Sequence, residues 1–144
     1  MALLTPLLAV LLYLAGIFTL TLGIVHFFFP VLLDFRHAIP LNGPPLKMFR
    51  LWPIYYQTKR RDVYGIAWAM NHASSYVLVT IGLFDLTWTI WQPAGWGKVL
   101  MIWIAGWWLI RTASHLYLGH RTGDLLTMLG FRGLAITHIL AAFM

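Results

Sequence analysis

The sequence predicts an all-α membrane protein, folded as a bundle of four transmembrane helices. Of its 144 residues, 60% are hydrophobic and only 10% are charged, and the mean hydropathy is +0.77. A soluble domain of this length could not bury so much apolar surface. The apolar residues also fall into four runs of about 20, which is the length that one helix needs to cross a bilayer.

The four expected helices span approximately residues 6–29, 62–86, 98–118 and 124–143, within a single membrane domain that covers residues 1–144. The first run does not resemble a secretory signal, because no Lys or Arg precedes it and no small-residue cleavage site follows its long apolar core. Asp62 and Asp124 stand where the second and fourth helices begin, and each is expected to be the N-cap of its helix.

Orientation follows from the basic residues of the loops. The loop between the first two helices carries Arg36, Lys47, Arg50, Lys59, Arg60 and Arg61, and the link between the last two carries Arg121. On the opposite side only Lys98 is basic. The positive-inside rule then places both connections in the cytoplasm and both termini on the extracytoplasmic side, in the inner (plasma) membrane of a bacterium. The segment "LKMFRLWPIYY" of the long loop is expected to lie among the lipid headgroups, or to cover a site as a lid.

The composition also narrows the classes of partner. The formal net charge is +6, but most of the basic residues lie in one loop, where membrane topology explains them, so no nucleic acid is expected. The expected partners are the lipid bilayer and other membrane subunits. The absence of cysteine excludes disulfides, thiolate metal sites and cysteine nucleophiles.

The stretch "AMNHASSYVLV", residues 69–79, carries five polar side chains inside an otherwise apolar run. Such groups are costly in hydrocarbon, so they predict a polar pocket between helices. At about 1.5 Å per residue, His72 lies about 15 Å and Arg132 about 12 Å from the cytoplasmic side. These depths predict one intramembrane pocket in the cytoplasmic half of the bundle, lined by His26, Asn71, His72, Tyr76, Arg111, His115 and Arg132.

Residues at steps of three and four predict the packing faces of the first two helices. This face comprises Gly16, Thr19, Gly23 and His26 on the first helix, and Gly65, Ala69, His72 and Tyr76 on the second. The two histidines would then point into the bundle. His138 lies away from the pocket and is expected to make an interhelical hydrogen bond.

The acids are too few to neutralise the predicted pocket. The chain has four Asp and no Glu. Two of them are assigned to helix caps, and Asp85 lies about 20 Å from Arg132 along straight helices. Only Asp34 could bend back toward the arginines. The surplus positive charge predicts an anionic ligand group, such as a carboxylate, a phosphate or the propionates of a haem.

These residues leave three functions open. The first is the binding of a cofactor or an anionic hydrophobic ligand in a membrane redox context. The candidates are haem b, a chlorophyll-type pigment, a quinone, or a metal held by His26, His72 and His115. The second is a non-catalytic accessory subunit of a larger membrane complex. The third is an enzyme that modifies a lipid or a quinone, with His72 or His115 as acid or base. No motif identifies catalytic residues, so enzyme activity is left open.

The segment "LGIVHFFFP", residues 22–30, resembles the end of the first helix in some small four-helix bacterial membrane proteins of the DoxX-like group. The resemblance covers nine residues, most of them apolar. No residue role is carried over from it.

Overall fold

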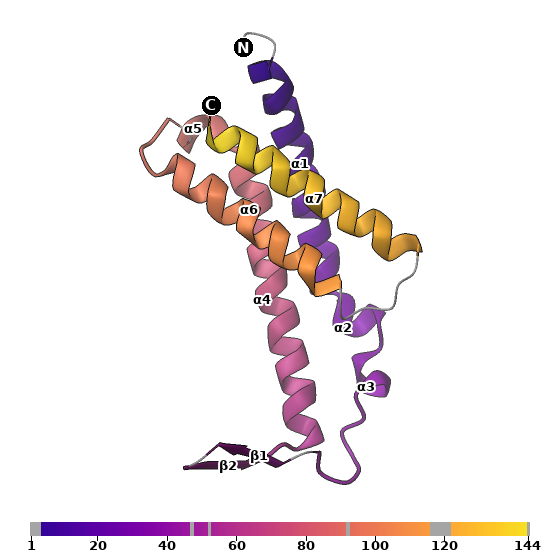
Figure 1. The fold of residues 1–144 in the computed structure, drawn as a ribbon. Coiled ribbons are helices and arrows are strands. Elements are labelled where there is room, and N and C mark those ends of the chain that lie inside the picture. Colours follow the sequence, from indigo (N-terminus) through magenta and orange to yellow (C-terminus); the bar gives the residue numbers. More distant parts are fainter. Residues whose placement is uncertain (1–3, 47, 52, 92, 116–121, 144) are drawn as a thin grey trace. The chain divides into compact units, whose positions relative to one another are not determined.

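The structure is a computed structural model that describes residues 4–46, 48–51, 53–91, 93–115 and 122–143 (Figure 1). The chain divides into two compact units. The first unit comprises Met1–Phe18 and Ile81–Met144, and the second unit comprises Thr19–Thr80. The single membrane domain expected from the sequence stays a prediction.

Helices occur at all four expected places. They are α1 (Leu4–Phe27), α4 (Arg60–Leu86), α6 (Gly97–Ser114) and α7 (Thr122–Ala142). Three short helices, α2 (Phe29–Leu32), α3 (Phe35–Ala38) and α5 (Trp88–Trp91), lie in the connections. The end expected for the third helix at Leu118 lies outside the described residues, as do Lys47 and Arg121, on which the orientation partly rests.

Two of the described helices are long and apolar enough to cross a membrane. The spans are Thr5–Phe27 of α1, with 23 residues, and Leu125–Ala142 of α7, with 18 residues. A helix rises about 1.5 Å per residue, so each span approaches or exceeds the hydrocarbon thickness of about 30 Å. The structure therefore confirms a helical protein with two possible membrane-spanning helices.

α1 ends where a proline follows it. Pro30 has no backbone N–H, so it cannot bond to the carbonyl of His26 as another helical turn would require. The chain turns at Phe28, and Pro30 falls in the first turn of α2, where proline is tolerated. The helix is therefore two residues shorter at this end than the expected range of 6–29.

The long loop contains a β-hairpin that the sequence analysis did not predict. Strands β1 (Met48–Leu51) and β2 (Ile54–Gln57) pair antiparallel, with Leu51 opposite Ile54. The hairpin is followed closely by α4, which begins two residues earlier than expected. Asp62 is not the N-cap: its carboxylate accepts the backbone N–H of Lys59 at 3.0 Å from inside the first turn, as the acid of a capping box does.

The expected packing face of α1 is confirmed, since Gly16, Thr19, Gly23 and His26 are all buried. In the first unit, a Cβ added to Gly16 would lie 2.9 Å from Cγ of Leu86. In the second unit, a Cβ added to Gly23 would lie 2.8 Å from the backbone nitrogen of Val79. In both units, therefore, α1 and α4 touch at a distance that only glycine allows.

The face expected for α4 is wrong. Gly65, Ala69 and Tyr76 are exposed, and the buried residues are Asn71, Ser75 and Leu78. The buried set also follows steps of four and three, so periodicity alone fitted both faces. The glycine of the expected stripe lies on open surface, with no atom within 4 Å of an added Cβ.

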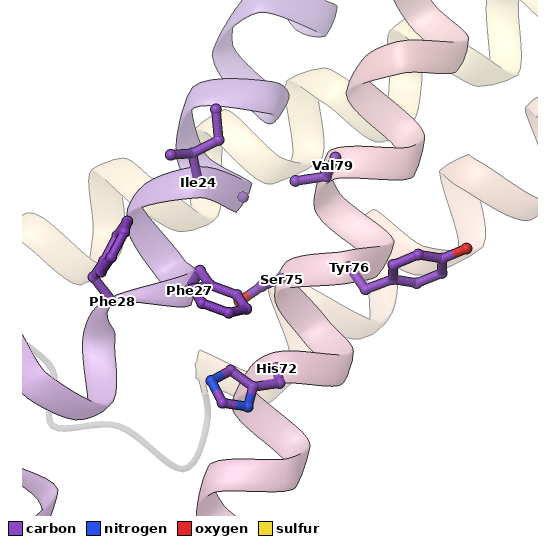
Figure 2. Close-up of a pocket in the computed structure, with 8 residues that line it drawn as sticks. Ile24, Phe27, Phe28, His72, Ser75, Tyr76 and Val79 are labelled. Carbon is purple, nitrogen blue, oxygen red and sulfur yellow. The ribbon is translucent and has the colours of Figure 1, made fainter.

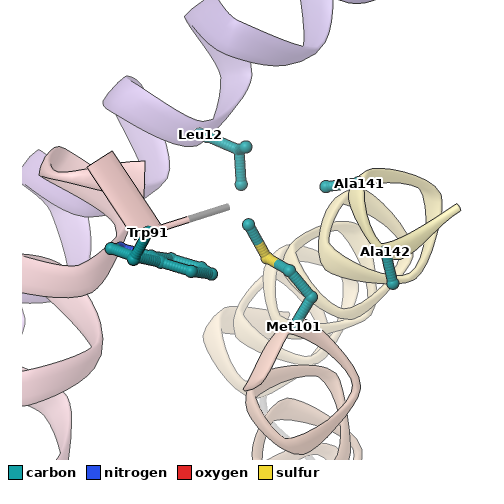
Figure 3. Packing of buried hydrophobic residues seen from close by; sticks show 5 residues of the cluster. All are labelled: Leu12, Trp91, Met101, Ala141 and Ala142. Atoms are coloured by element: carbon teal, nitrogen blue, oxygen red, sulfur yellow. The ribbon is translucent and has the colours of Figure 1, made fainter. Parts of the chain in front are cut away.

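In the first unit, α6 and α7 lie side by side and antiparallel (Figure 1). One buried cluster joins Leu12 of α1, Trp91 of α5 and Met101 of α6 to Ala141 and Ala142 of α7 (Figure 3). The two small alanines leave room for the larger Trp91 and Met101, which are 6% and 0% exposed. Such interlocking of large and small side chains is the contact that holds helices together when the solvent is lipid.

We expect Gly23→Leu to lower the free energy of unfolding by about 1–3 kcal/mol, because the added side chain would meet the backbone of α4. Gly65→Ala is the matched control. It adds a methyl group in open space and should leave stability unchanged or raise it by up to about 1 kcal/mol through helix propensity. Thermal unfolding in detergent measures both. Equal effects of the two substitutions would contradict the close approach of the helices.

Candidate functional site

A chain of hydrogen bonds joins the end of α1 to the middle of α4 in the second unit. The amide of Asn71 donates from Nδ2 to the backbone carbonyl of His26 at 2.9 Å. This is the carbonyl that the proline at position 30 leaves without its helical donor. Asn71 thus satisfies a buried acceptor that the helix itself cannot satisfy.

Ser75 fixes the tautomer of His26. The Ser75 hydroxyl donates to the carbonyl of Asn71 at 2.8 Å, since a carbonyl can only accept. Its oxygen lies 3.3 Å from Nδ1 of His26, which must then carry the proton and donate. All three side chains are buried. Asn71 and Ser75 therefore act here as structural links between the helices.

His72 lies beside this chain of bonds but takes no part in it. Its ring stacks on Phe27, with centroids 4.6 Å apart and an interplanar angle of 26°. The edge of Trp68 approaches it at 5.3 Å. Within the described residues, no hydrogen bond reaches either ring nitrogen of His72. The two aromatic rings orient the imidazole and leave its polar atoms available.

A cleft of about 370 Å³ opens between α1 and α4, next to His72 (Figure 2). Its described lining comprises Gly23, Ile24, Phe27, Phe28, His72, Ser75, Tyr76 and Val79. Tyr76 borders the cleft, but it is 74% exposed and its ring points away from the cavity (Figure 2). The hydroxyl of Ser75 is committed to Asn71. The cleft is therefore an apolar cavity whose available polar group is the imidazole of His72.

A second group of expected site residues lies in the first unit. The ring of Phe131 of α7 lies near Trp108 and Arg111 of α6 and near His115, which follows that helix. The ring centroid of Phe131 is 5.1 Å from that of Trp108, 5.5 Å from that of His115 and 5.9 Å from Cζ of Arg111. Nε of Arg111 and Nδ1 of His115 are buried, without a hydrogen-bond partner in the part of the chain that the structure describes. Buried polar atoms of this kind normally bond to water or to a ligand.

Arg132 does not join this group. Its side chain is exposed on α7, although the neighbouring Phe131 is buried. The expected pocket thus consists of two sets, one with His26, Asn71, His72 and Tyr76 in the second unit, the other with Arg111 and His115 in the first. Their convergence into one site stays a prediction.

The metal site expected from His26, His72 and His115 is not supported. Over the described residues, no group of three His, Cys, Asp or Glu side chains is placed to hold a metal ion. His26 and His72 lie in the second unit, whereas His115 lies in the first.

Asp34 does not bend back toward the arginines. Its carboxylate bonds to Nδ1 of His37, three residues later, and both side chains are largely exposed. The backbone of Asp34 is left-handed, with φ at 47°, which short polar residues tolerate at the start of a turn. This bond holds the carboxylate of Asp34 against the short helix α3, which begins at the next residue.

Among the acids whose side chains the structure describes, the buried one is Asp85, which was expected to lie outside the site. Oδ1 of Asp85 lies 2.9 Å from Nε2 of His138, and both side chains are 0% exposed. Nδ1 of His138 donates to the carbonyl of Leu134 at 2.7 Å, so one proton remains to be shared between Nε2 and the carboxylate. Oδ2 of Asp85 has no partner among the described side chains. The interhelical bond expected of His138 is confirmed.

The chain matches no family model, no curated protein and no solved structure. The short likeness of residues 22–30 to the DoxX-like group therefore stays a resemblance only.

We expect His138→Leu to lower the free energy of unfolding by about 3–5 kcal/mol, because it leaves the buried carboxylate of Asp85 unpaired. Replacing both residues, as Asp85→Leu with His138→Leu, should recover most of that loss by removing the charge as well. Chemical unfolding in detergent of the single and double variants measures the difference. A double variant as unstable as His138→Leu alone would show that the unpaired carboxylate is not the cause.

Proposed function

We propose that this chain is an integral membrane protein that binds a quinone, or a similar lipid-soluble carbonyl compound, in the cleft between α1 and α4. In this proposal all four long helices cross the bilayer, with both termini on the extracytoplasmic side. The observation that carries the proposal is the apolar cleft with one available polar group, His72, at its wall.

Exposed side chains support the crossing of α4 and α6. The exposed faces carry Ile66, Met70 and Leu83 on α4 and Val99, Ile102 and Ile110 on α6, each more than half exposed. Helices of 27 and 18 residues are about 40 and 27 Å long, against a hydrocarbon thickness of about 30 Å. Lipid would cover these faces, whereas water would not favour them.

The chemistry of the cleft favours a quinone among the ligands considered. An aromatic and aliphatic wall suits a flat apolar ring and its tail, and an imidazole N–H suits a carbonyl oxygen. The described lining contains no Lys or Arg that could hold haem propionates. The described lining contains one histidine, His72, so it offers no second imidazole as an axial ligand. These features disfavour haem b and a chlorophyll-type pigment at this place.

Binding is proposed here without a catalytic role. A general acid or base needs a partner that orients it or exchanges protons with it. Among the described residues, none forms a hydrogen bond or an ion pair with His72, and its ring packs on Phe27 and Trp68. The residue is therefore assigned to hold a ligand carbonyl by one hydrogen bond.

We expect His72→Phe to weaken the binding of a short-chain benzoquinone by about three- to tenfold, the effect of one lost hydrogen bond. Phe keeps the stacking on Phe27, so the fold should persist. Tyr76→Phe is the control, since that hydroxyl points away from the cleft, and its affinity should equal that of the unchanged protein. Quenching of tryptophan fluorescence in detergent measures the binding.

Two results would contradict the quinone proposal. One is equal affinity of the His72→Phe and Tyr76→Phe proteins for the quinone. The other is a Soret band, or a red absorption band, in the purified protein, which would assign the pocket to haem or to a chlorophyll-type pigment.

The proposed topology places Thr58 in the cytoplasm and Gly95 outside. The chain has no cysteine, so Thr58→Cys and Gly95→Cys each introduce a single thiol. In intact cells a membrane-impermeant thiol reagent should label Gly95→Cys and not Thr58→Cys, because the positive-inside rule holds the basic loop inside. Labelling of Thr58→Cys from outside would invert the orientation.

A further inference from the structure

Arg132 stands in the middle of a possible membrane span. α7 has 21 residues, of which ten precede Arg132 and ten follow it. The residue also lies inside the apolar span Leu125–Ala142. A charge at such a depth is costly in hydrocarbon, and arginines in membrane helices usually find an acceptor.

The described side chains supply no acceptor for Arg132. Among the residues that the structure places, none makes a hydrogen bond, an ion pair or a ring contact with Arg132, whereas Arg111 lies over the ring of Phe131. Three of the four acids are engaged elsewhere: Asp34 with His37, Asp62 with the N–H of Lys59, and Asp85 with His138. The fourth, Asp124, lies eight residues away on the same helix, about 12 Å along its axis.

The surface around Arg132 has the spacing of a helix–helix seam. Residues 125, 129, 132, 136, 139 and 143 follow one another at steps of four, three, four, three and four. The five apolar members are Leu125, Leu129, Ile136, Ile139 and Phe143, which are 39–71% exposed. Beside the arginine, Gly133 has no atom within 4 Å of an added Cβ, so another helix can approach closely there.

We propose that this face of α7 docks against a transmembrane helix of another membrane protein that carries an Asp or Glu at matching depth. The carboxylate would neutralise Arg132 through a charge-assisted, bidentate bond. A second copy of this chain does not meet the requirement, because its acids are engaged or lie at helix ends. One polar residue in an apolar seam also fixes the register of the two helices.

This partner helix would make the chain a subunit of a larger membrane assembly. The inference requires that α7 cross the bilayer, but it does not depend on the ligand of the α1–α4 cleft. The cleft lies in the second unit and the α7 face in the first. A failure of quinone binding would therefore leave the docking surface intact.

The test uses the full chain, reconstituted in phosphatidylcholine vesicles. Three polyleucine transmembrane peptides, with a central Glu, Gln or Leu and a dansyl acceptor, are titrated against its tryptophan fluorescence. We expect the Glu peptide to bind about tenfold or more tightly than the Leu peptide, with the Gln peptide between them. In Arg132→Leu the three peptides should bind alike.

Two further variants control for charge and for folding. Arg132→Lys keeps the charge and should retain part of the preference for Glu. Lys59→Gln removes a positive charge from the loop before α4 and should retain all of it. Because Arg132→Leu removes no hydrogen bond or ion pair among the described residues, its thermal stability should equal or exceed that of the unchanged protein.

Three outcomes would overturn the proposal. The first is equal binding of the Glu and Leu peptides to the unchanged protein, which means that Arg132 reaches the headgroups instead of a partner. The second is a preference for Glu that survives in Arg132→Leu. The third is chemical crosslinking of the chain into dimers through single cysteines on the α7 face, undisturbed by the Glu peptide, which means that a second copy covers this face.

Discussion

The close approach of α1 and α4 at Gly23 is the constraint on which the second unit depends. Without a side chain at this position, the backbones of the two helices come near enough for short polar side chains to reach across. His26 lies one turn further along α1, and Asn71 and Ser75 of α4 bond to its carbonyl and to its ring. The same approach sets Phe27 against His72 and leaves the cleft beside them. One glycine contact thus positions both the structural bonds and the candidate site.

The polar side chains of residues 69–79 have two roles, because they project from α4 in different directions. Asn71 and Ser75, four residues apart, face inward and satisfy groups that would otherwise be buried without partners. His72 stands between aromatic rings at the edge of the cleft, and Tyr76 is exposed. A polar residue in an otherwise apolar helix is therefore not by itself a site residue. The distinction depends on whether its polar atoms are already engaged.

The helical architecture could be predicted from the sequence, because runs of about 20 apolar residues have few other uses. The α1 face was also predictable, since glycines spaced by seven mark a close contact. The α4 face was not, because the steps of four and three that join Gly65, Ala69, His72 and Tyr76 also join Asn71, Ser75 and Leu78. The hairpin at residues 48–57 was missed because proline and aromatic residues suggested only an interfacial loop. For Asp85, only the distance to Arg132 was considered. Its partner in the structure is His138, a residue that was already expected to make an interhelical hydrogen bond.

The bond between Asp85 and His138 has a consequence for the order in which the chain is made. The two residues are 53 positions apart, and the ribosome completes α4 well before α7 emerges. Until then, α4 carries a carboxylate with no imidazole to receive it. In the proposed topology, where α4 crosses the bilayer, the translocon would hold α4 in a wet or protein-lined place, or admit it with its acid protonated. In that topology, release of α4 into lipid is coupled to the arrival of α7. The first unit is then completed only after its last helix has been made.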